Sequence, residues 1–228
     1  RLKAFITIDH GAALQTARRA ENQIKKGKYL GPLHGIPISL KDLYQTKGMR
    51  TTGGSKFLQD WIPDEDATSV ANLRAAGAVI IGKTNLHEFA FGGTTQNPHF
   101  GSAKNPYNPA HIPGGSSGGS AIAVATGMSI ASTGSDTGGS IRTPSALCGI
   151  VGLKPTYGRV SLHGIIPLAW SLDHVGPMTK SVRDAALMLS AMAGFDPKDP
   201  SSAKAKVAKF ERALKDDVKR LKIGVEPS

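Results

Sequence analysis

The chain has 228 residues, of which 39% are apolar and 20% charged, a composition that excludes a disordered or fibrous protein. Its net charge of +11 would suit a nucleic-acid partner. The basic residues, however, concentrate in segments 18–28 and 204–222 without interleaved aromatic residues, so we expect solvated helix faces and no direct nucleic-acid binding. A single cysteine, the lack of a secretion signal and the lack of a long apolar run predict a cytoplasmic protein that does not engage a membrane.

Helix and strand patterns alternate over the first part of the chain. Apolar residues at spacings of three and four predict an amphipathic helix over 12–26, and a run of β-formers predicts a buried strand over 36–40. Lys41 and Asp42 stand at the end of that strand. A second helix is predicted over 67–76, capped by Asp66, with a strand over 79–81 after it. This alternation is typical of an α/β protein, which displays its chemistry at strand ends.

Glycine-rich turns mark the middle of the chain. Residues 92–115 show no periodicity and predict an ordered loop that serves a site. The turn 114–120 leads into a tightly packed helix over 121–126 and a strand over 130–133. A second turn, 134–140, leads into a helix over 141–147 and a strand over 150–153. A flexible linker is the alternative for 114–120, but apolar helix material follows it at once, which favours an ordered turn.

The last part of the chain is predicted to contain helices and one strand. Ser181 and Asp184 form a capping box for a helix that ends at Gly194. Apolar residues at helical spacing between Val207 and Leu221 predict another helix, and 223–225 a final strand. The elements together predict an α/β fold, with a mixed β-sheet core flanked by helices, in a single domain over 1–228.

Lys41 and Ser140 are residue types that serine-dependent catalysis requires. A lysine buried at a strand end loses hydration, which disfavours its charged form and lets it act as a base. Taken alone, a strand-end lysine such as Lys41 is more often a solvated surface residue. Thr137, Gly138 and Gly139 precede Ser140, and their successive backbone N–H groups suit an oxyanion beside a serine nucleophile.

Several segments resemble the amidase signature family. They are residues 35–42 (GIPISLKD), 82–85 (GKTN), 113–120 (PGGSSGGS), 134–142 (GSDTGGSIR) and 148–156 (CGIVGLKPT). The resemblance implies a Ser–cis-Ser–Lys triad. In that triad Lys41 is the base, Ser116 is a relay serine that follows a cis peptide bond, and Ser140 is the nucleophile that becomes acylated.

The resemblance also implies the reaction, which is hydrolysis of a small carboxylic amide through an acyl-enzyme. The backbone amides of Thr137, Gly138 and Gly139 would bind the oxyanion, and Asp136 and Arg142 would support the turn without reacting. No cofactor and no metal are expected. Members of the family are longer than this chain, so we expect an incomplete, N-terminal part of the fold that lacks the C-terminal half, and low activity from it.

A second interpretation within the family is the A subunit of the glutamyl-tRNA amidotransferase, which releases ammonia from glutamine for its partners. Residues 157–161 (YGRVS) are shared with that subunit, whereas 92–95 (GGTT) and 169–172 (AWSL) look more like free-standing amidases. We therefore favour the hydrolase over the amidotransferase. The expected partners are an amide substrate and, depending on the interpretation, a second copy of the chain or amidotransferase subunits.

Other classes of protein are disfavoured by the residues themselves. Segment 77–84 (GAVIIGKT) has the spacing of a nucleotide-binding P-loop, but residues 78–81 have the apolar, β-branched character of a strand and not of an open loop. His87 and Glu88 resemble the start of a zinc-protease helix, yet Phe91 stands where the second histidine is needed. Cys148 has no base near it in sequence and is expected to be a small buried apolar residue.

Overall fold

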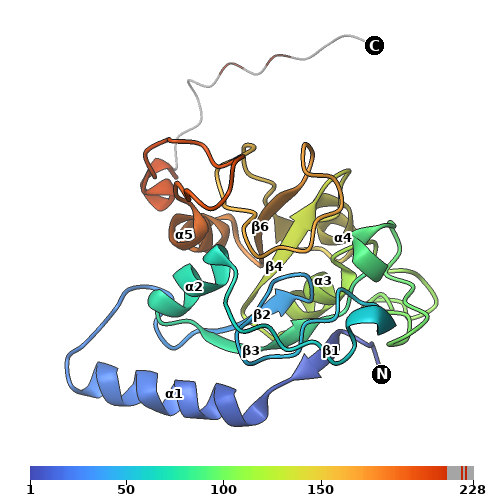
Figure 1. The fold of residues 1–228 in the computed structure, drawn as a ribbon, viewed down its shortest axis with the longest axis horizontal. Coiled ribbons are helices and arrows are strands. Elements are labelled where there is room, and N and C mark those ends of the chain that lie inside the picture. Colours follow the sequence, from blue (N-terminus) through green and yellow to red (C-terminus); the bar gives the residue numbers. More distant parts are fainter. Residues whose placement is uncertain (215–221, 223, 225–228) are drawn as a thin grey trace.

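The computed structural model describes residues 1–214, 222 and 224, and these form one six-stranded mixed sheet with helices around it (Figure 1). The strands are β1 (Phe5–Ile8), β2 (Pro37–Lys41), β3 (Val79–Thr84), β4 (Ala131–Asp136), β5 (Val151–Gly152) and β6 (His174–Thr179). The α-helices are α1 (His10–Lys25), α2 (Thr68–Ala75), α3 (Gly118–Ala125), α4 (Arg142–Leu147) and α5 (Val182–Met192), with short 3-10 helices η1 (Lys56–Leu58), η2 (Glu88–Ala90) and η3 (Phe210–Ala213). The predicted fold class is confirmed.

The strand order β1-β3-β2-β4-β6-β5 places β2 between β3 and β4, and it runs parallel to both. β1 and β6 pair antiparallel with β3 and β4. The carboxyl ends of the three parallel strands therefore lie at the same edge of the sheet. Lys41, Thr84 and Asp136 are the residues at these ends.

Side chains of β2 alternate between two environments, as the pleat of a strand requires. Ile38 and Leu40 are fully buried in the larger apolar cluster, to which α2 and α5 also contribute. Ser39 and Lys41 point to the other face, where α3 packs against β2 and β4. The strand thus anchors itself with its apolar residues and presents Lys41 toward the glycine-rich turns.

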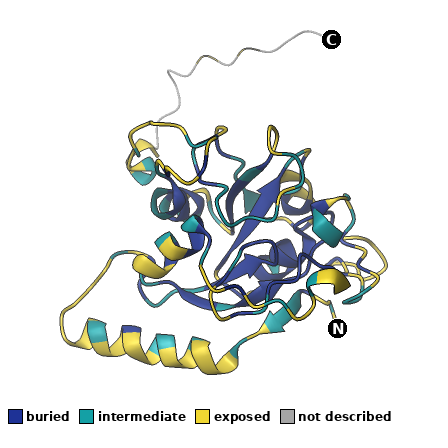
Figure 2. Ribbon diagram, in the orientation of Figure 1, coloured by how far each residue is buried: buried dark blue, intermediate teal, exposed yellow. Residues whose placement is uncertain are grey.

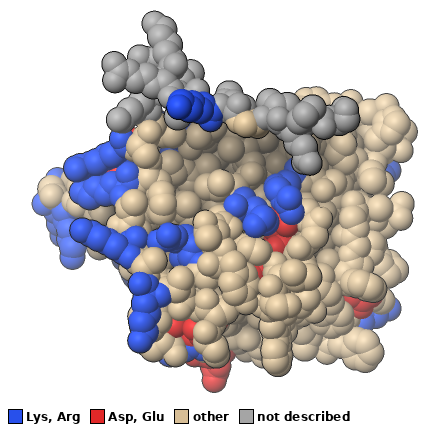
Figure 3. All heavy atoms as spheres, turned by 90° about the horizontal axis from the view of Figure 1, so that it is seen from above, with Lys and Arg blue, Asp and Glu red and all other residues tan. Residues whose placement is uncertain are grey.

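Helices α1 and α3 differ sharply in exposure (Figure 2). In α3 every residue from Gly118 to Val124 is buried, whereas Ala20 is the buried residue of α1. The predicted apolar face of α1 is largely in solvent, with Leu14 59% and Ile24 44% exposed. On the face drawn in Figure 3, Lys and Arg side chains outnumber Asp and Glu, as the net charge of +11 leads one to expect. None of the helices in the described residues combines the length and apolar character needed to cross a bilayer.

Several predicted elements are confirmed and others need correction. Ser181 caps α5 as predicted, its hydroxyl accepting a hydrogen bond from Asp184 N at 3.1 Å. Asp66 does not cap α2: its carboxylate instead accepts from Lys47 N at 2.8 Å and pairs with Arg74 at 3.1 Å. The strand predicted over 79–81 continues to Thr84, because the glycine and the two polar residues that end it also lie in the sheet.

Two strands and one helix depart from the sequence-based prediction. β1 has four residues, and β6 contains glycine and proline, which argue against a strand when only the sequence is read. In place of the helix predicted between Val207 and Leu221, the described residues contain a short 3-10 helix, Phe210–Ala213. The rest of that prediction, and most of the strand at 223–225, fall outside the described residues.

Candidate active site

Lys41 ends β2 with its side chain fully buried, and its amine contacts two hydroxyls. Nζ donates to Ser116 Oγ at 2.6 Å and to Ser135 Oγ at 2.8 Å. Burial lowers the pKa of Lys41 from 10.5 to about 7, although the negative charges of Asp136 and Asp173 act to raise it. A lysine with this pKa is neutral in a large fraction of molecules near neutral pH, so it can accept a proton.

Ser116 lies in the first glycine-rich turn, directly before α3. The peptide bond between Gly115 and Ser116 is cis. Gly115 has no room for a side chain, because a Cβ there would lie 2.7 Å from Thr94 N. Thr95 holds the turn from outside: its Oγ1 donates to Gly114 O at 2.8 Å. The same oxygen accepts from Gly118 N at 3.1 Å, so one threonine side chain bridges both ends of the turn.

Ser117 joins the two glycine-rich turns. Its N–H donates to Ser140 O at 3.3 Å, and its hydroxyl donates to Ser135 O at 3.2 Å and accepts from Ser135 N at 3.3 Å. Ser140 therefore lies beside the turn that carries Ser116. The side chain of Ser140 is partly exposed, and no described residue is hydrogen-bonded to its hydroxyl. Lys41 and Ser116 are in direct contact, whereas Ser140 is linked to this pair through its backbone carbonyl, which accepts from the N–H of Ser117.

The turn before α4 presents unpaired backbone N–H groups. No described residue accepts a hydrogen bond from the N–H of Thr137, Gly138 or Gly139. Gly138 is exposed, and a Cβ on it would meet nothing within 4 Å. The hydroxyl of Thr137 donates to Asp173 Oδ1 at 2.5 Å, which fixes the start of the turn. Such N–H groups can hold a developing negative charge beside Ser140.

Asp136 and Arg142 support this turn as predicted. Burial works against the charged form of Asp136, but hydrogen bonds from Arg142 and Ile141 outweigh it, so the pKa of Asp136 lies below its ordinary value. Asp136 Oδ2 accepts from Ile141 N at 3.0 Å and Arg142 Nε at 3.1 Å, and Oδ1 accepts from Arg142 Nη2 at 2.9 Å. These contacts close the turn that carries Ser140.

A cavity of about 720 Å³ lies beside Asp173. Its walls combine apolar and aromatic side chains with a few charged ones: Tyr157, Leu162, His163, Ile165, Pro167, Trp170, Asp173, Lys198 and Asp199, among others. Asp173 both lines this cavity and holds Thr137. The cavity is therefore linked to the turn with the unpaired N–H groups, and its volume suits a small organic molecule.

Known proteins similar to this chain all point to one family. The family model described as Amidase matches residues 1–228. The chain belongs to the amidase family. Among curated relatives, the glutamyl-tRNA(Gln) amidotransferase A subunit of Lachnospira eligens is 52% identical over 224 residues, which are 98% of this chain and 47% of that protein. The A subunit of the same enzyme in Carboxydothermus hydrogenoformans is 49% identical over 225 residues, 99% of this chain and 46% of that protein.

Solved structures of the family superpose closely on this chain. The native peptide amidase of Stenotrophomonas maltophilia has a TM-score of 0.89 and 44% identity, covering 93% of this chain and 45% of that one. The glutamyl-tRNA(Gln) amidotransferase A subunit of Thermotoga maritima has a TM-score of 0.75 and 42% identity, covering 85% of this chain and 46% of that one. The chain thus spans about half the length of the curated relatives it matches.

The rival site predictions can be placed in the structure. The lysine of the P-loop-like segment, Lys83, is fully buried within β3 and cannot reach a phosphate in solvent. Glu88 pairs with His99 at 3.0 Å, and the side chain of His87 lies 3.2 Å from Thr94 Oγ1. Cys148 is buried as expected, and burial raises its thiol pKa to about 12, so this thiol is inert.

Ser117, Ser135 and Thr95 are site residues that the sequence pattern does not reveal. For Ser135 the reason is the strand end: the pattern stops the strand at residue 133, whereas β4 runs to Asp136 and places that hydroxyl beside Lys41. A strand predicted to end at residue 136 would place Ser135 at the same edge of the sheet as Lys41. The pattern marks Ser117 only as the neighbour of Ser116, and Thr95 only as part of a loop without periodicity.

Proposed function

We propose that this chain carries a centre that cleaves the C–N bond of a carboxylic amide, with Ser140 as nucleophile, Ser116 as proton relay and Lys41 as base. The observation that supports it most is the 2.6 Å hydrogen bond between the buried Lys41 amine and Ser116 Oγ. An amine that burial makes neutral in a large fraction of molecules near neutral pH, in direct contact with a serine hydroxyl, is placed to take the proton of that hydroxyl.

In the proposed mechanism, Lys41 takes the proton of Ser116 as Ser116 takes that of Ser140. Ser140 Oγ attacks the amide carbonyl carbon, and the N–H groups of Thr137, Gly138 and Gly139 stabilise the tetrahedral oxyanion. The proton returns through Ser116 to the nitrogen as the C–N bond breaks, leaving an acyl group on Ser140. Water or another nucleophile then attacks the acyl-enzyme by the same path in reverse.

For the substrate class, we propose glutamine-dependent release of ammonia, as in the A subunit of an amidotransferase, ahead of a free-standing amidase. Segments 92–95 and 169–172 favour the hydrolase, but the curated relatives at 49% and 52% identity support the amidotransferase better. Peptide amidases among the solved structures keep the free-standing enzyme as the second candidate. Amidotransferase partner subunits and a cytoplasmic location belong to the first proposal.

Covalent labelling tests the nucleophile. We expect a fluorophosphonate to add one group to the chain, which peptide mass spectrometry locates on Ser140. Ser140→Ala should abolish the label, and Ser116→Ala should slow labelling by at least about 100-fold because it removes the relay. Ser102→Ala, at an exposed position, is the matched control and should label at the normal rate. A label on another residue in the unmodified chain would refute the assignment.

Ammonia release separates the two substrate classes. We expect release from glutamine when the partner subunits of the amidotransferase are added, and little from simple aliphatic or peptide amides. Turnover of peptide amides by the chain alone, with no response to glutamine, would support the free-standing amidase instead. The Ser140→Ala variant serves as the blank in both assays.

A further inference from the structure

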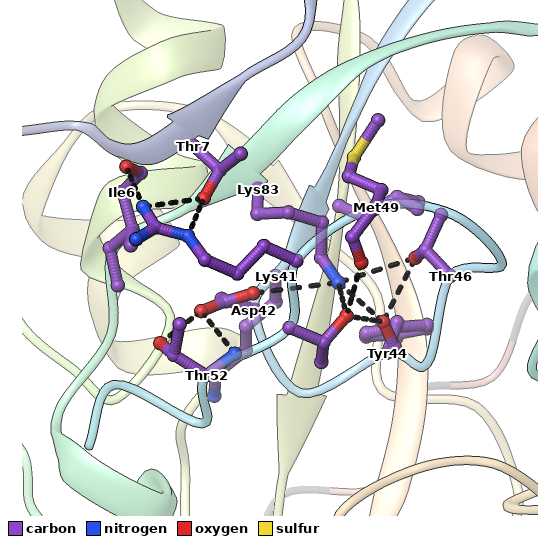
Figure 4. Close-up of polar contacts among 12 residues, drawn as sticks. Ile6, Thr7, Lys41, Asp42, Tyr44, Thr46, Met49, Thr52 and Lys83 are labelled. Atoms are coloured by element: carbon purple, nitrogen blue, oxygen red, sulfur yellow. Dashed lines mark hydrogen bonds and ion pairs between the residues drawn. The ribbon is translucent and has the colours of Figure 1, made fainter. Parts of the chain in front are cut away.

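Lys83 is a second fully buried lysine, and its ammonium is surrounded by acceptors (Figure 4). It lies in β3, where it pairs with Leu40 of β2. Nζ donates to Tyr44 O at 2.5 Å, to Thr51 Oγ1 at 2.7 Å and to Thr46 Oγ1 at 3.2 Å. Nothing in the proposed reaction uses this lysine, although a buried ammonium is costly unless the surrounding groups compensate for it.

The acceptors around Lys83 fit a protonated amine. The hydroxyl of Thr46 donates to Tyr44 O at 2.9 Å and that of Thr51 to Met49 O at 3.2 Å, so both oxygens are left to accept from Lys83. Together with Tyr44 O they match the three N–H donors of an ammonium. Burial lowers the pKa of Lys83 only to about 8, because Asp42 opposes the effect, so the ammonium is the major form at neutral pH.

Asp42 is the buried counter-charge of Lys83. Its Oδ1 lies 3.4 Å from Lys83 Nζ and has no hydrogen-bond partner among the described residues, while Oδ2 accepts from Thr52 N at 2.9 Å and Thr52 Oγ1 at 2.5 Å. Asp42 directly follows Lys41. The ion pair therefore ties β3 to the first residue after the catalytic strand.

Tyr44 links the contacts of Lys83 in β3 to β4, the strand on the other side of β2. Lys83 holds the carbonyl of Tyr44, and the Tyr44 hydroxyl donates to Gly134 O at 2.7 Å. Gly134 precedes Ser135, whose Oγ accepts from Lys41 Nζ at 2.8 Å. The contacts of Lys83 thus reach the strand that carries Lys41 and the strand that carries one of its two hydroxyl partners.

We propose that Lys83 is a positioning residue for Lys41: its ammonium fixes the segment 42–52, which directly follows Lys41 and, through Tyr44, contacts β4, so that the Lys41 amine is held against Ser116 and Ser135. This inference rests on the proposed function, since it assigns Lys41 the part of a base. It also gives a role to the lysine of the P-loop-like segment, which binds a carbonyl, hydroxyls and a carboxylate of its own chain.

The charged groups near both lysines determine which variants can test this role. Lys83 is faced by Asp42, by Asp66 and by Arg74 of α2. Lys41 is faced by Asp136 of β4 and by Asp173 before β6, and its charge helps to lower the pKa of His87 after β3. Asp42 and Lys83 offset each other, so removing both leaves the net charge near Lys41 unchanged and isolates the effect of position.

The experiment measures kcat/KM against pH for the unmodified chain and for Thr51→Val, Lys83→Met and the double variant Asp42→Asn/Lys83→Met. We expect the rise that reports Lys41 to move upward by about one pH unit in the double variant, because an amine that is no longer held in its buried position regains part of its hydration. kcat should fall about tenfold or more with KM nearly constant. Thr51→Val, which removes one acceptor and no charge, should shift the rise in the same direction by less.

A second readout separates failure of this inference from failure of the proposed function. The side-chain NMR titration of Lys41, assigned with Lys41→Met, requires no turnover. Absence of acyl transfer with a Lys41 midpoint that still shifts in the variants would refute the proposed function and support the positioning role. Unchanged midpoints in folded Thr51→Val and in the double variant would overturn the positioning role. Lys83→Met alone leaves the buried Asp42 without its counter-charge and can destabilise the fold. The positioning role is therefore judged on Thr51→Val and on the double variant.

Discussion

Single residues show how one fold gives two buried lysines different neighbours. Lys83 faces a carboxylate and three oxygen acceptors, which retain its proton. Lys41 faces the hydroxyls of Ser116 and Ser135, and its pKa falls to about 7. Hydroxyls can give or accept a proton, whereas the carboxylate fixes the charge of its partner. The hydroxyl neighbours of Lys41, more than the small difference between the two pKa values, therefore favour Lys41 as the proposed base.

The pH dependence of acyl transfer follows from the Lys41 pKa. The base must be neutral, so kcat/KM should rise with pH, with a midpoint of about 7, and level off at higher pH. A steady-state profile with an activated amide measures this between about pH 5.5 and 9. Lys41→Arg, which stays protonated, should be inactive throughout. A profile that is flat across neutral pH would contradict the role of Lys41.

Lys41 should also lower the stability of the fold. Its folded pKa of about 7 lies below the ordinary value of 10.5, so the unfolded chain binds more protons between these values. The free energy of unfolding should therefore increase as pH rises from about 7 to 10. Lys41→Met should be about 1–2 kcal/mol more stable at pH 7, with a weaker pH dependence, in denaturant titrations. Equal stability and equal slope would show that burial of the amine carries no cost.

Candidate site residues can be named from the sequence where a chemical motif stands out, and their roles stay predictions. Lys41, Ser116 and Ser140 follow from the resemblance and from the chemistry that a strand end and glycine turns can support. The surroundings of Ser135 and Lys83 do not, for one reason: each lies in the last part of a strand that the sequence pattern ends too early, at 133 and 81. Burial of a polar side chain in a strand depends on which segments pack against it, and this cannot be read from the neighbouring residues in the sequence.

At the scale of elements, the glycine-rich turns act through close packing. Gly119 in the first turn of α3 lies against the segment that follows β3, and a Cβ there would come within 2.4 Å of Asn85 O and 2.5 Å of Ala4 O. Gly119→Ala should therefore cost about 1–3 kcal/mol in thermal or chemical unfolding. Gly93→Ala, where a Cβ would meet nothing within 4 Å, is the control and should be close to neutral. Equal effects would contradict the packing argument.

Helices and strands with a clear period are predictable, while short or interrupted strands are not. α5 follows its apolar spacing and its cap signal closely, and α1 has nearly the bounds that its spacing predicts, although its apolar face is largely exposed. β6 has a Gly-Pro step and is a strand because it pairs with β4 over its whole length. Tertiary pairing overrides local preference in such a segment. The same reasoning explains β1, which has four residues and exists because β3 has a free side for it.

At the scale of the whole molecule, β1 closes one side of the sheet. It pairs antiparallel with β3, and Asn85 N donates to Ala4 O at 2.8 Å. Deleting residues 1–8 would leave the backbone groups of β3 unpaired, and such an edge favours association with other chains. We expect a lower melting temperature and dimers or larger species in size-exclusion chromatography. Ile8→Thr, at an exposed position that keeps a β-former, should stay monodisperse to the same degree as the parent chain.

The place of β2 between β3 and β4 also has a consequence for biosynthesis. Its partner in β4, Ala131, leaves the ribosome long after Ile38, with α2, β3 and α3 translated between them. Until then the nascent chain holds Lys41 without the hydroxyls of Ser116 and Ser135, so the amine stays hydrated and fully protonated. The neutral form of the lysine thus arises only after β4 has been translated, when the segments on either side of β2 can pack against it.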